Sequence, residues 1–201
     1  MANFLDINPV DLQVLLKLVN DNVNATLNCV RVGIIQSFNP TKQTVNLKLT
    51  NKMLINFKSL DPSDQPIYKE IDQLLDCPLL LQGGINSGLT FPDIVGSECI
   101  VLFADRDIDN WFINGGIQSH ASYRMHDFSD GFCLLRPRSL PNIINNYDTE
   151  NVTIFYGNSV IKIGNSGVQI IGDLSVTGDL SVTGEITTSN INTPLINGQP
   201  V

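Results

Sequence analysis

The stretch VRVGIIQSFNPTKQTVNLKL at residues 30–49 indicates the fold class of this chain. Apolar residues alternate with others on both sides of its centre, at Val30, Val32 and Ile34 and again at Val45, Leu47 and Leu49. Alternation with a period of two is the pattern of a β-strand that buries one face. The middle residues, 39–42, include a proline and are typical of a turn. The stretch therefore predicts an antiparallel hairpin with one buried face.

Further short strands are predicted downstream of this hairpin. Residues 77–82 and 98–104 are apolar runs of strand length, and residues 111–113 are a third run, placed before a Gly-Gly pair. About five to seven short strands separated by turns indicate a small barrel or sandwich. We assign this all-β domain to residues 26–140.

The residues before the hairpin follow a helical pattern instead. Apolar side chains recur at three- and four-residue spacing, at Leu12, Leu15, Leu16, Val19 and Val23. Asn8 can cap the first turn, and Pro9 suits the first helical position. The pattern predicts a short helix over residues 8–23, within an N-terminal segment of residues 1–25. Its apolar stripe is expected to pack on the barrel or on another chain.

Composition narrows the range of functions. Of the 201 residues, 42% are hydrophobic and only 16% are charged, and the net charge is −8. An acidic surface repels phosphate backbones, so we expect no nucleic-acid partner. The first residues lack the basic and apolar regions of a secretory signal, and no apolar run reaches membrane-spanning length. The cysteines at positions 29, 77, 99 and 133 are far apart, which favours buried apolar residues over zinc ligands or disulfides.

The tail of the chain repeats a six-residue unit. GDLSVT occupies residues 172–177, recurs at 178–183, and is followed by a degenerate copy, GEITTS, at 184–189. Each of the first two copies has two apolar residues two positions apart and a glycine where the backbone must turn, as in a β-solenoid. A stretch rich in asparagine, assigned to residues 141–150, separates the tail from the barrel as a linker.

Three repeat copies cannot bury a core within one chain, because each unit needs stacked neighbours. Three chains wound around one axis would pair every strand edge and direct the apolar residues inward. We therefore expect an intertwined homotrimeric β-helix over residues 151–201. Its predicted core and trimer-interface residues are Ile163, Ile170, Leu174, Val176, Leu180, Val182 and Ile186, and its predicted corners are Gly172, Gly178 and Gly184. The alternative is a monomeric array of β-hairpins attached to the barrel.

Acidic residues at 105, 107 and 109 have the spacing of an EF-hand calcium loop. The sixth position of such a loop is glycine and the twelfth is glutamate, but here they are Asn110 and Gly116. We therefore predict a carboxylate cluster that stabilises a turn, with Arg106 as its salt-bridge partner, and no metal or other cofactor. His120 and His126 are expected in loops, with His126 hydrogen-bonded within its loop. No GxSxG, HExxH or phosphate-binding loop is present, so we expect no enzyme activity.

The stretch VLFADRDIDNWF at residues 101–112 continues through NGG at 114–116 and RMHDFSDG at 124–131. It resembles the N-terminal domain of the phage Gp138-like spike proteins, relatives of the P2 gpV and Mu baseplate spikes, best over residues 92–136. The motif residues are Asp105, Arg106, Asp107, Asp109, Trp111, Phe112, Gly115, Asp130 and Gly131. Trp111 and Phe112 are expected in the barrel core or the trimer interface. The resemblance implies an OB-fold-like barrel followed by a trimeric β-helix needle.

The resemblance also implies a function and its partners. The chain is expected to be the central spike of a contractile phage tail or related injection machine, bound under the baseplate hub protein. Sheath contraction would drive it through the outer envelope of the host. It would reside in the virion after synthesis in the host cytoplasm. Many such spikes bind iron through a His-x-His motif at the apex, whereas residues 197–201 are NGQPV. We therefore expect no tip iron: either the tip is free of metal or a separate tip protein caps it.

Two other classes of protein are alternatives. A trimeric tail fibre or adhesin would share the repeat, but it is expected to carry a receptor-binding domain after it. A polysaccharide-cleaving enzyme would need a pair of carboxylates flanking its substrate. The 20 acidic residues of this chain form no pattern specific to such a site.

Overall fold

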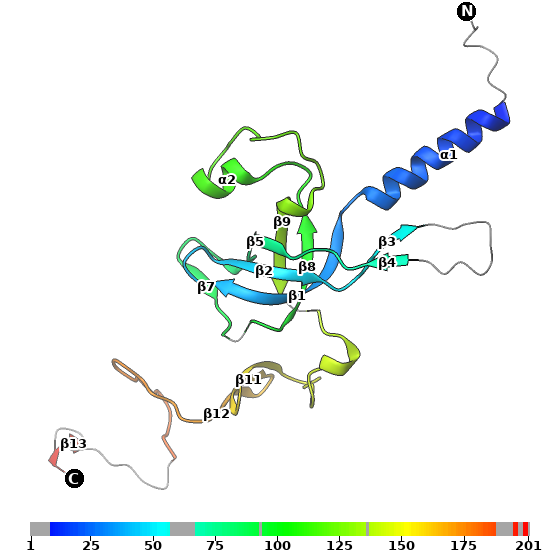
Figure 1. The fold of residues 1–201 in the computed structure, drawn as a ribbon. Helices are drawn as coiled ribbons and strands as arrows, with labels where there is room; N and C mark the ends of the chain where they lie inside the picture. The colour runs from blue at the N-terminus through cyan, green and yellow to red at the C-terminus, as the bar shows by residue number, and fades with distance from the viewer. Residues whose placement is uncertain are drawn as a thin grey trace, which may run out of the picture. The chain divides into compact units, whose positions relative to one another are not determined.

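The computed structural model describes residues 9–56, 67–92, 94–135, 137–187, 195–196 and 199–200. The chain divides into two compact units, Met1–Ile143 and Ile144–Val201 (Figure 1). The boundary between them lies inside the stretch that the sequence indicates as a linker.

The first unit is built on a curled, half-barrel sheet (Figure 1). Its strands, in spatial order, are β5 (Leu74–Pro78), β2 (Thr44–Leu49), β1 (Val30–Asn39), β8 (Glu98–Phe103) and β9 (Gly131–Leu135). All neighbouring pairs are antiparallel. A parallel bridge joins Leu79, just after β5, to Cys133 of β9, and the amide of Leu80 donates to the Cys133 carbonyl at 2.8 Å. The two edges of the sheet are therefore in contact.

The core of the first unit combines buried residues of the five sheet strands with Ile71 and Ile94. Its buried apolar residues are Ile35, Val45, Leu47, Leu49, Ile71, Leu74, Cys77, Ile94, Cys99, Val101, Phe103 and Cys133. The predicted burial of alternate residues in β2 is confirmed. Burial also confirms the prediction for Cys77, Cys99 and Cys133, and it raises the pKa of the Cys77 thiol to about 12. Cys29 is exposed, so the prediction for that cysteine is wrong.

The buried face of β1 is the opposite of the predicted one. Val30 and Val32 are 57% and 39% exposed, whereas Gly33 and Ile35 face inward. The reason is the close approach of β1 to its neighbours. A Cβ at Gly33 would lie 3.0 Å from Leu47 Cδ1 and 3.3 Å from Cys99 Sγ, so glycine is what allows those side chains to pack there.

The helices confirm one prediction and correct another. The N-terminal helix α1 spans Pro9–Thr26, close to the predicted range. Residues 111–113, predicted as a strand, belong to the short helix α2 (Asp109–Asn114). Hydrogen bonds from Phe112 N to the Ile108 carbonyl (2.8 Å) and from Gly115 N to the Trp111 carbonyl (2.7 Å) form its turns. Gly115 ends the helix with φ +66°, a left-handed conformation that glycine adopts without strain.

Smaller elements connect the sheet strands. Two hairpins pair β3 (Met53–Asn56) with β4 (Ile67–Lys69) and β6 (Gln82–Gly84) with β7 (Ser87–Leu89). Two 3-10 turns, η1 (Phe128–Asp130) and η2 (Leu140–Asn142), flank β9. Neither helix of the described residues has the length and apolar content needed to cross a bilayer.

The second unit contains a three-stranded antiparallel sheet. Its strands are β10 (Val152–Tyr156), β11 (Ser159–Gly164) and β12 (Gly167–Ile171), in that order. Residues 173–187, which contain most of the repeat, form no strand, and a short pair, β13 (Leu195–Ile196) with β14 (Gln199–Pro200), follows. Residues 188 and 189 of the third repeat copy, and most of the NGQPV end, lie outside the described residues. Within this single chain, residues 152–171 form a meander and not a β-helix.

Candidate functional site

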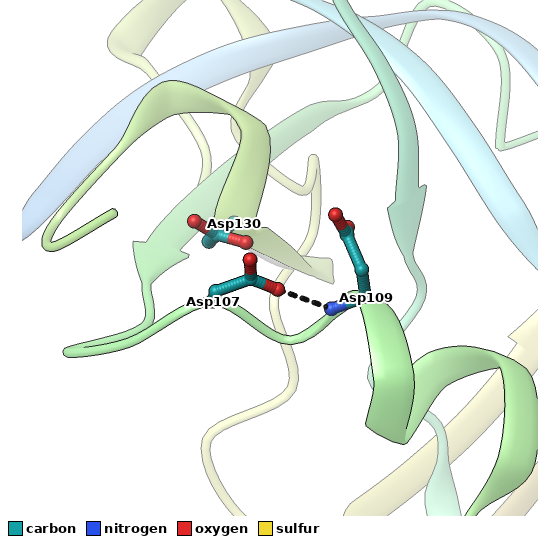
Figure 2. Close-up of side chains that lie close together, drawn as sticks. All are labelled: Asp107, Asp109 and Asp130. Atoms are coloured by element: carbon teal, nitrogen blue, oxygen red, sulfur yellow. Dashed lines mark hydrogen bonds between the residues drawn. The ribbon is translucent and has the colours of Figure 1, made fainter. Parts of the chain in front are cut away.

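Most of the motif residues lie on the long connection between β8 and β9. Figure 2 shows Asp107, Asp109 and Asp130, whose carboxylate groups converge with one oxygen from each within 4.8 Å of the others. Asp130 is fully buried and Asp107 is 7% exposed, while Asp109 is at the surface. The prediction of a carboxylate cluster is confirmed for Asp107 and Asp109 only. Asp130 takes the third place from the far end of the connection, and the predicted member Asp105 lies outside the cluster, next to Arg106 and His126.

The cation of the cluster is Arg124, not the predicted Arg106. Its Nε donates to Asp130 Oδ2 at 3.1 Å, and its Nη2 donates to Asp130 Oδ1 at 3.0 Å and to Asp109 Oδ2 at 2.9 Å. These hydrogen bonds, to Asp130 first and then to Asp109, raise the pKa of the guanidinium above its already high value. Arg106 forms only an exposed pair with Asp105, at 3.5 Å.

Asp107 is held by donors from the same connection. Its Oδ1 accepts from the backbone amide of Asp109 at 2.8 Å, and its Oδ2 accepts a short hydrogen bond from the Ser122 hydroxyl. Arg124 Nη2 lies 3.5 Å from the same carboxylate. The pKa of Asp107 is lowered, chiefly by the Ser122 hydroxyl and then by the Asp109 amide, because both stabilise the ionised form.

Three carboxylates could in principle hold a metal ion, but hydrogen-bond donors of the protein already occupy their oxygens. Asp130 Oδ1 also accepts from the amide of Ile108 at 3.1 Å. Calcium needs six to eight oxygen ligands, and here the inward oxygens receive N–H and O–H groups and a guanidinium instead. The arrangement therefore acts as a clasp that fixes the β8–β9 connection in place.

A second set of contacts ties this connection to the segment before β1. His126 Nδ1 lies 3.1 Å from the Asn28 carbonyl, and Asn28 Nδ2 donates to the His126 carbonyl at 3.1 Å. His126 Nε2 lies 3.2 Å from Asp105 Oδ1. His126 is expected to bond within its own loop, and Asp105, on the same connection, lies beside it. Its hydrogen-bond partner Asn28 is distant in sequence. His120 lies in an exposed loop, as predicted.

The remaining motif residues have packing roles. Gly131 is buried, and a Cβ there would lie 3.1 Å from Val101 Cγ1 and 3.4 Å from Phe103 Cε1. Trp111 and Phe112 are 44% and 38% exposed, so the expectation of a core position is wrong for this chain by itself. Trp111 contacts Phe132 of β9 edge-on, with the ring centroids 5.6 Å apart.

In the second unit, one apolar face of the sheet is uncovered. Ile163 pairs with Val152 on one side and Val168 on the other, and Ile161 pairs with Ile154 and Ile170. The register places these six residues on the same face. Each is at least 40% exposed: Val152 67%, Ile154 54%, Ile161 40%, Ile163 45%, Val168 63% and Ile170 44%.

The repeat residues are exposed as well. The predicted core positions of the repeat are Leu174 (65% exposed), Val176 (47%), Leu180 (69%), Val182 (46%) and Ile186 (60%). Gly172 and Gly178 have almost the same φ, +118° and +121°, so the first two copies turn in the same way. Gly184, the third predicted corner, has no such positive φ.

These features define a β-rich half-barrel domain followed by a repeat tail. A family model described as the phage protein Gp138 N-terminal domain matches residues 32–135, more than half of the chain, and the chain belongs to this family. The matched range runs from β1 through β9 and includes the Arg124 cluster. The match supports a structural role in a phage and association with the virion. A search of curated proteins found no match.

Proposed function

We propose that this chain is the central spike of a contractile phage tail or of a related injection machine. In this proposal three copies form one spike, with the half-barrel attached beneath the baseplate hub and the second unit as the needle. Sheath contraction pushes the needle through the host envelope. The family membership supports the phage setting, and the proposal of a trimer rests on the second unit.

The observation that carries the proposal is the uncovered apolar face of β10–β12. A sheet with one apolar face must bury that face against another element. Burying apolar surface contributes about 25 cal/mol per Å², so six apolar side chains at 40% exposure or more leave considerable stabilisation unused within one chain. Identical faces from three chains around an axis would cover one another.

The described residues of the six-residue repeat after β12 also lack strand partners within their own chain. Residues 173–187 form no strand within their own chain. Backbone amides and carbonyls are ordinarily paired in folded structure, so a neighbouring chain is a natural partner for them. The similar φ of Gly172 and Gly178 supports a regular six-residue winding, in which Leu174, Val176 and Leu180 point the same way.

The half-barrel suits the role of a base. Five antiparallel strands with a parallel bridge between the edge strands agree with an OB-like barrel, in the sense of a small, partly open, five-stranded barrel. The Arg124 clasp and the His126–Asn28 contacts anchor the longest connection of this barrel. A base held in this way can transmit force to the needle without unfolding locally.

The test is the native mass of the purified chain by light scattering, followed by its binding to cells of a susceptible host. A mass of three times 22.1 kDa supports the shared needle. A mass of one chain would contradict the spike. A trimer that binds cells stably by itself would favour the tail-fibre alternative, because a spike driven by contraction needs no receptor affinity.

A further inference from the structure

Helix α1 presents a continuous apolar seam that its own chain leaves open. Leu12, Leu16, Val19 and Val23 follow one another at spacings of four, three and four residues. This is the a/d spacing of a coiled coil, with Leu16 and Val23 at a and Leu12 and Val19 at d. Their side chains are 43%, 60%, 53% and 50% exposed.

The charged residues of α1 are placed to allow identical copies to meet along this seam. Asp11, Lys17 and Asp21 fall at positions c, b and f, on the side away from the seam. The flanking e and g positions are uncharged: Gln13 and Asn20 at e, and Leu15 and Asn22 at g. Parallel copies in register would therefore bring no like charges together at the positions that decide coiled-coil pairing.

On the other side of α1, apolar residues form no second stripe along the whole helix. Val14 and Leu18, on the outer side, are 52% and 61% exposed, but the next residues along that line are Asp21 and Ala25. A membrane-surface helix would carry several Lys or Arg residues on its polar face, whereas α1 has only Lys17. An isolated helix of 18 residues that contains several valines and asparagines is marginal in water, so its stability depends on packing along the seam.

From these observations we infer that α1 is a second oligomerisation element, in which three copies of this chain form a parallel coiled coil through Leu12, Leu16, Val19 and Val23. The inference rests on the homotrimer of the proposed function. It adds to that trimer a contact between N-terminal helices, at the other end of the sequence from the needle. The partner is another copy of α1, not a helix of the hub.

The experiment is disulfide trapping in the full-length chain with Cys29→Ser, which removes the exposed thiol next to α1. Val19→Cys places a thiol in the seam. Leu18→Cys is the matched control, because it is adjacent, apolar and similarly exposed in the single chain. Under mild oxidation the seam variant should form linked dimers about tenfold faster than the control, because contact raises the effective thiol concentration far above that in bulk solution.

The outcomes separate this inference from the proposed function. Equal cross-linking of the two variants, or none in either while the mass stays at three chains, would overturn the coiled coil and leave the trimeric needle standing. A monomeric mass for the Cys29→Ser parent would overturn both. A trimer with fast cross-linking at position 19 alone supports the inference.

Discussion

Arg124 donates two hydrogen bonds to Asp130, from Nε to Oδ2 at 3.1 Å and from Nη2 to Oδ1 at 3.0 Å. Asp130 is fully buried at the end of η1, directly before β9, whereas the side chain of Arg124 is 30% exposed. The pair lies near the end of the β8–β9 connection, and Arg124 also reaches Asp109 near the start of this connection. A buried carboxylate is tolerated because this fork and the amide of Ile108 satisfy it.

Arg124→Ala should destabilise the half-barrel by about 3 kcal/mol, because it leaves the buried carboxylate of Asp130 without its cation. Arg124→Lys should recover only part of this, since an ammonium group cannot reproduce the two-pronged geometry. Denaturant unfolding measures the free energy of unfolding of both variants. Arg106→Ala is the control and should change the free energy of unfolding by less than about 0.5 kcal/mol, as for an exposed pair. Equal losses at positions 106 and 124 would contradict the assignment of Arg124 as the central cation.

Acid should weaken the half-barrel through Asp107. Its folded-state pKa lies below the unfolded value of about 3.9, so the folded protein binds fewer protons there. The stabilisation is complete above the unfolded pKa and is lost as the pH falls through the folded one. Unfolding measured at neutral pH and below pH 4 should show the decline. Ser122→Ala, which removes the main cause of the shift, should flatten this decline relative to wild type, and an unchanged slope would contradict the assignment.

Val176→Asp should prevent assembly of the proposed needle, because it would bring three carboxylates together near one axis. Ser175→Asp is the matched control, because in the proposed β-helix the side chain of residue 175 would point to the opposite side from that of Val176. Light scattering should give one chain mass for the first variant and three for the second. An 18-residue α1 is too short to hold the chains together alone at dilute concentrations. A stable trimer of Val176→Asp would show that this residue does not point inward.

The repeat glycines should differ in their tolerance of a side chain. Gly178→Ala should cost about 1–2 kcal/mol per chain, because φ +121° is strained for an L-residue even though the space around it is open. Gly184→Ala should be neutral, since that residue has no positive φ and an added Cβ would meet no atom within 4 Å. The difference in stability between the two variants is measured by thermal unfolding of the second unit, monitored through its resistance to protease. Equal tolerance would mean that the corners are not fixed by backbone conformation.

Several features could be predicted from sequence because they depend on local periodicity. Two-residue alternation placed Val45, Leu47 and Leu49 in the core, and three- to four-residue spacing located α1 within a few residues. The six-residue repeat indicated where apolar side chains would be left without partners in one chain. Such patterns follow from backbone geometry alone.

Other features could not be predicted, because they depend on neighbours distant in sequence. Residues 111–113 have strand-like composition, yet they form α2 with the preceding turn at Ile108. Apolar residues occupy consecutive positions, Ile34 and Ile35, so alternation could not decide which face of β1 is buried. The close approach of Leu47 to Gly33 decided it.

The sequence by itself determined a β-rich domain, an amphipathic N-terminal helix and a repeat tail, because each is encoded by the spacing of apolar residues along a few turns or strands. Only the tertiary structure decided which cation completes the carboxylate cluster. Arg106 lies next to Asp107 in sequence, but Arg124 is the one that the folded connection brings to the buried Asp130. Ion-pair choice is set by burial and three-dimensional geometry, and the order of residues along the chain does not contain either directly.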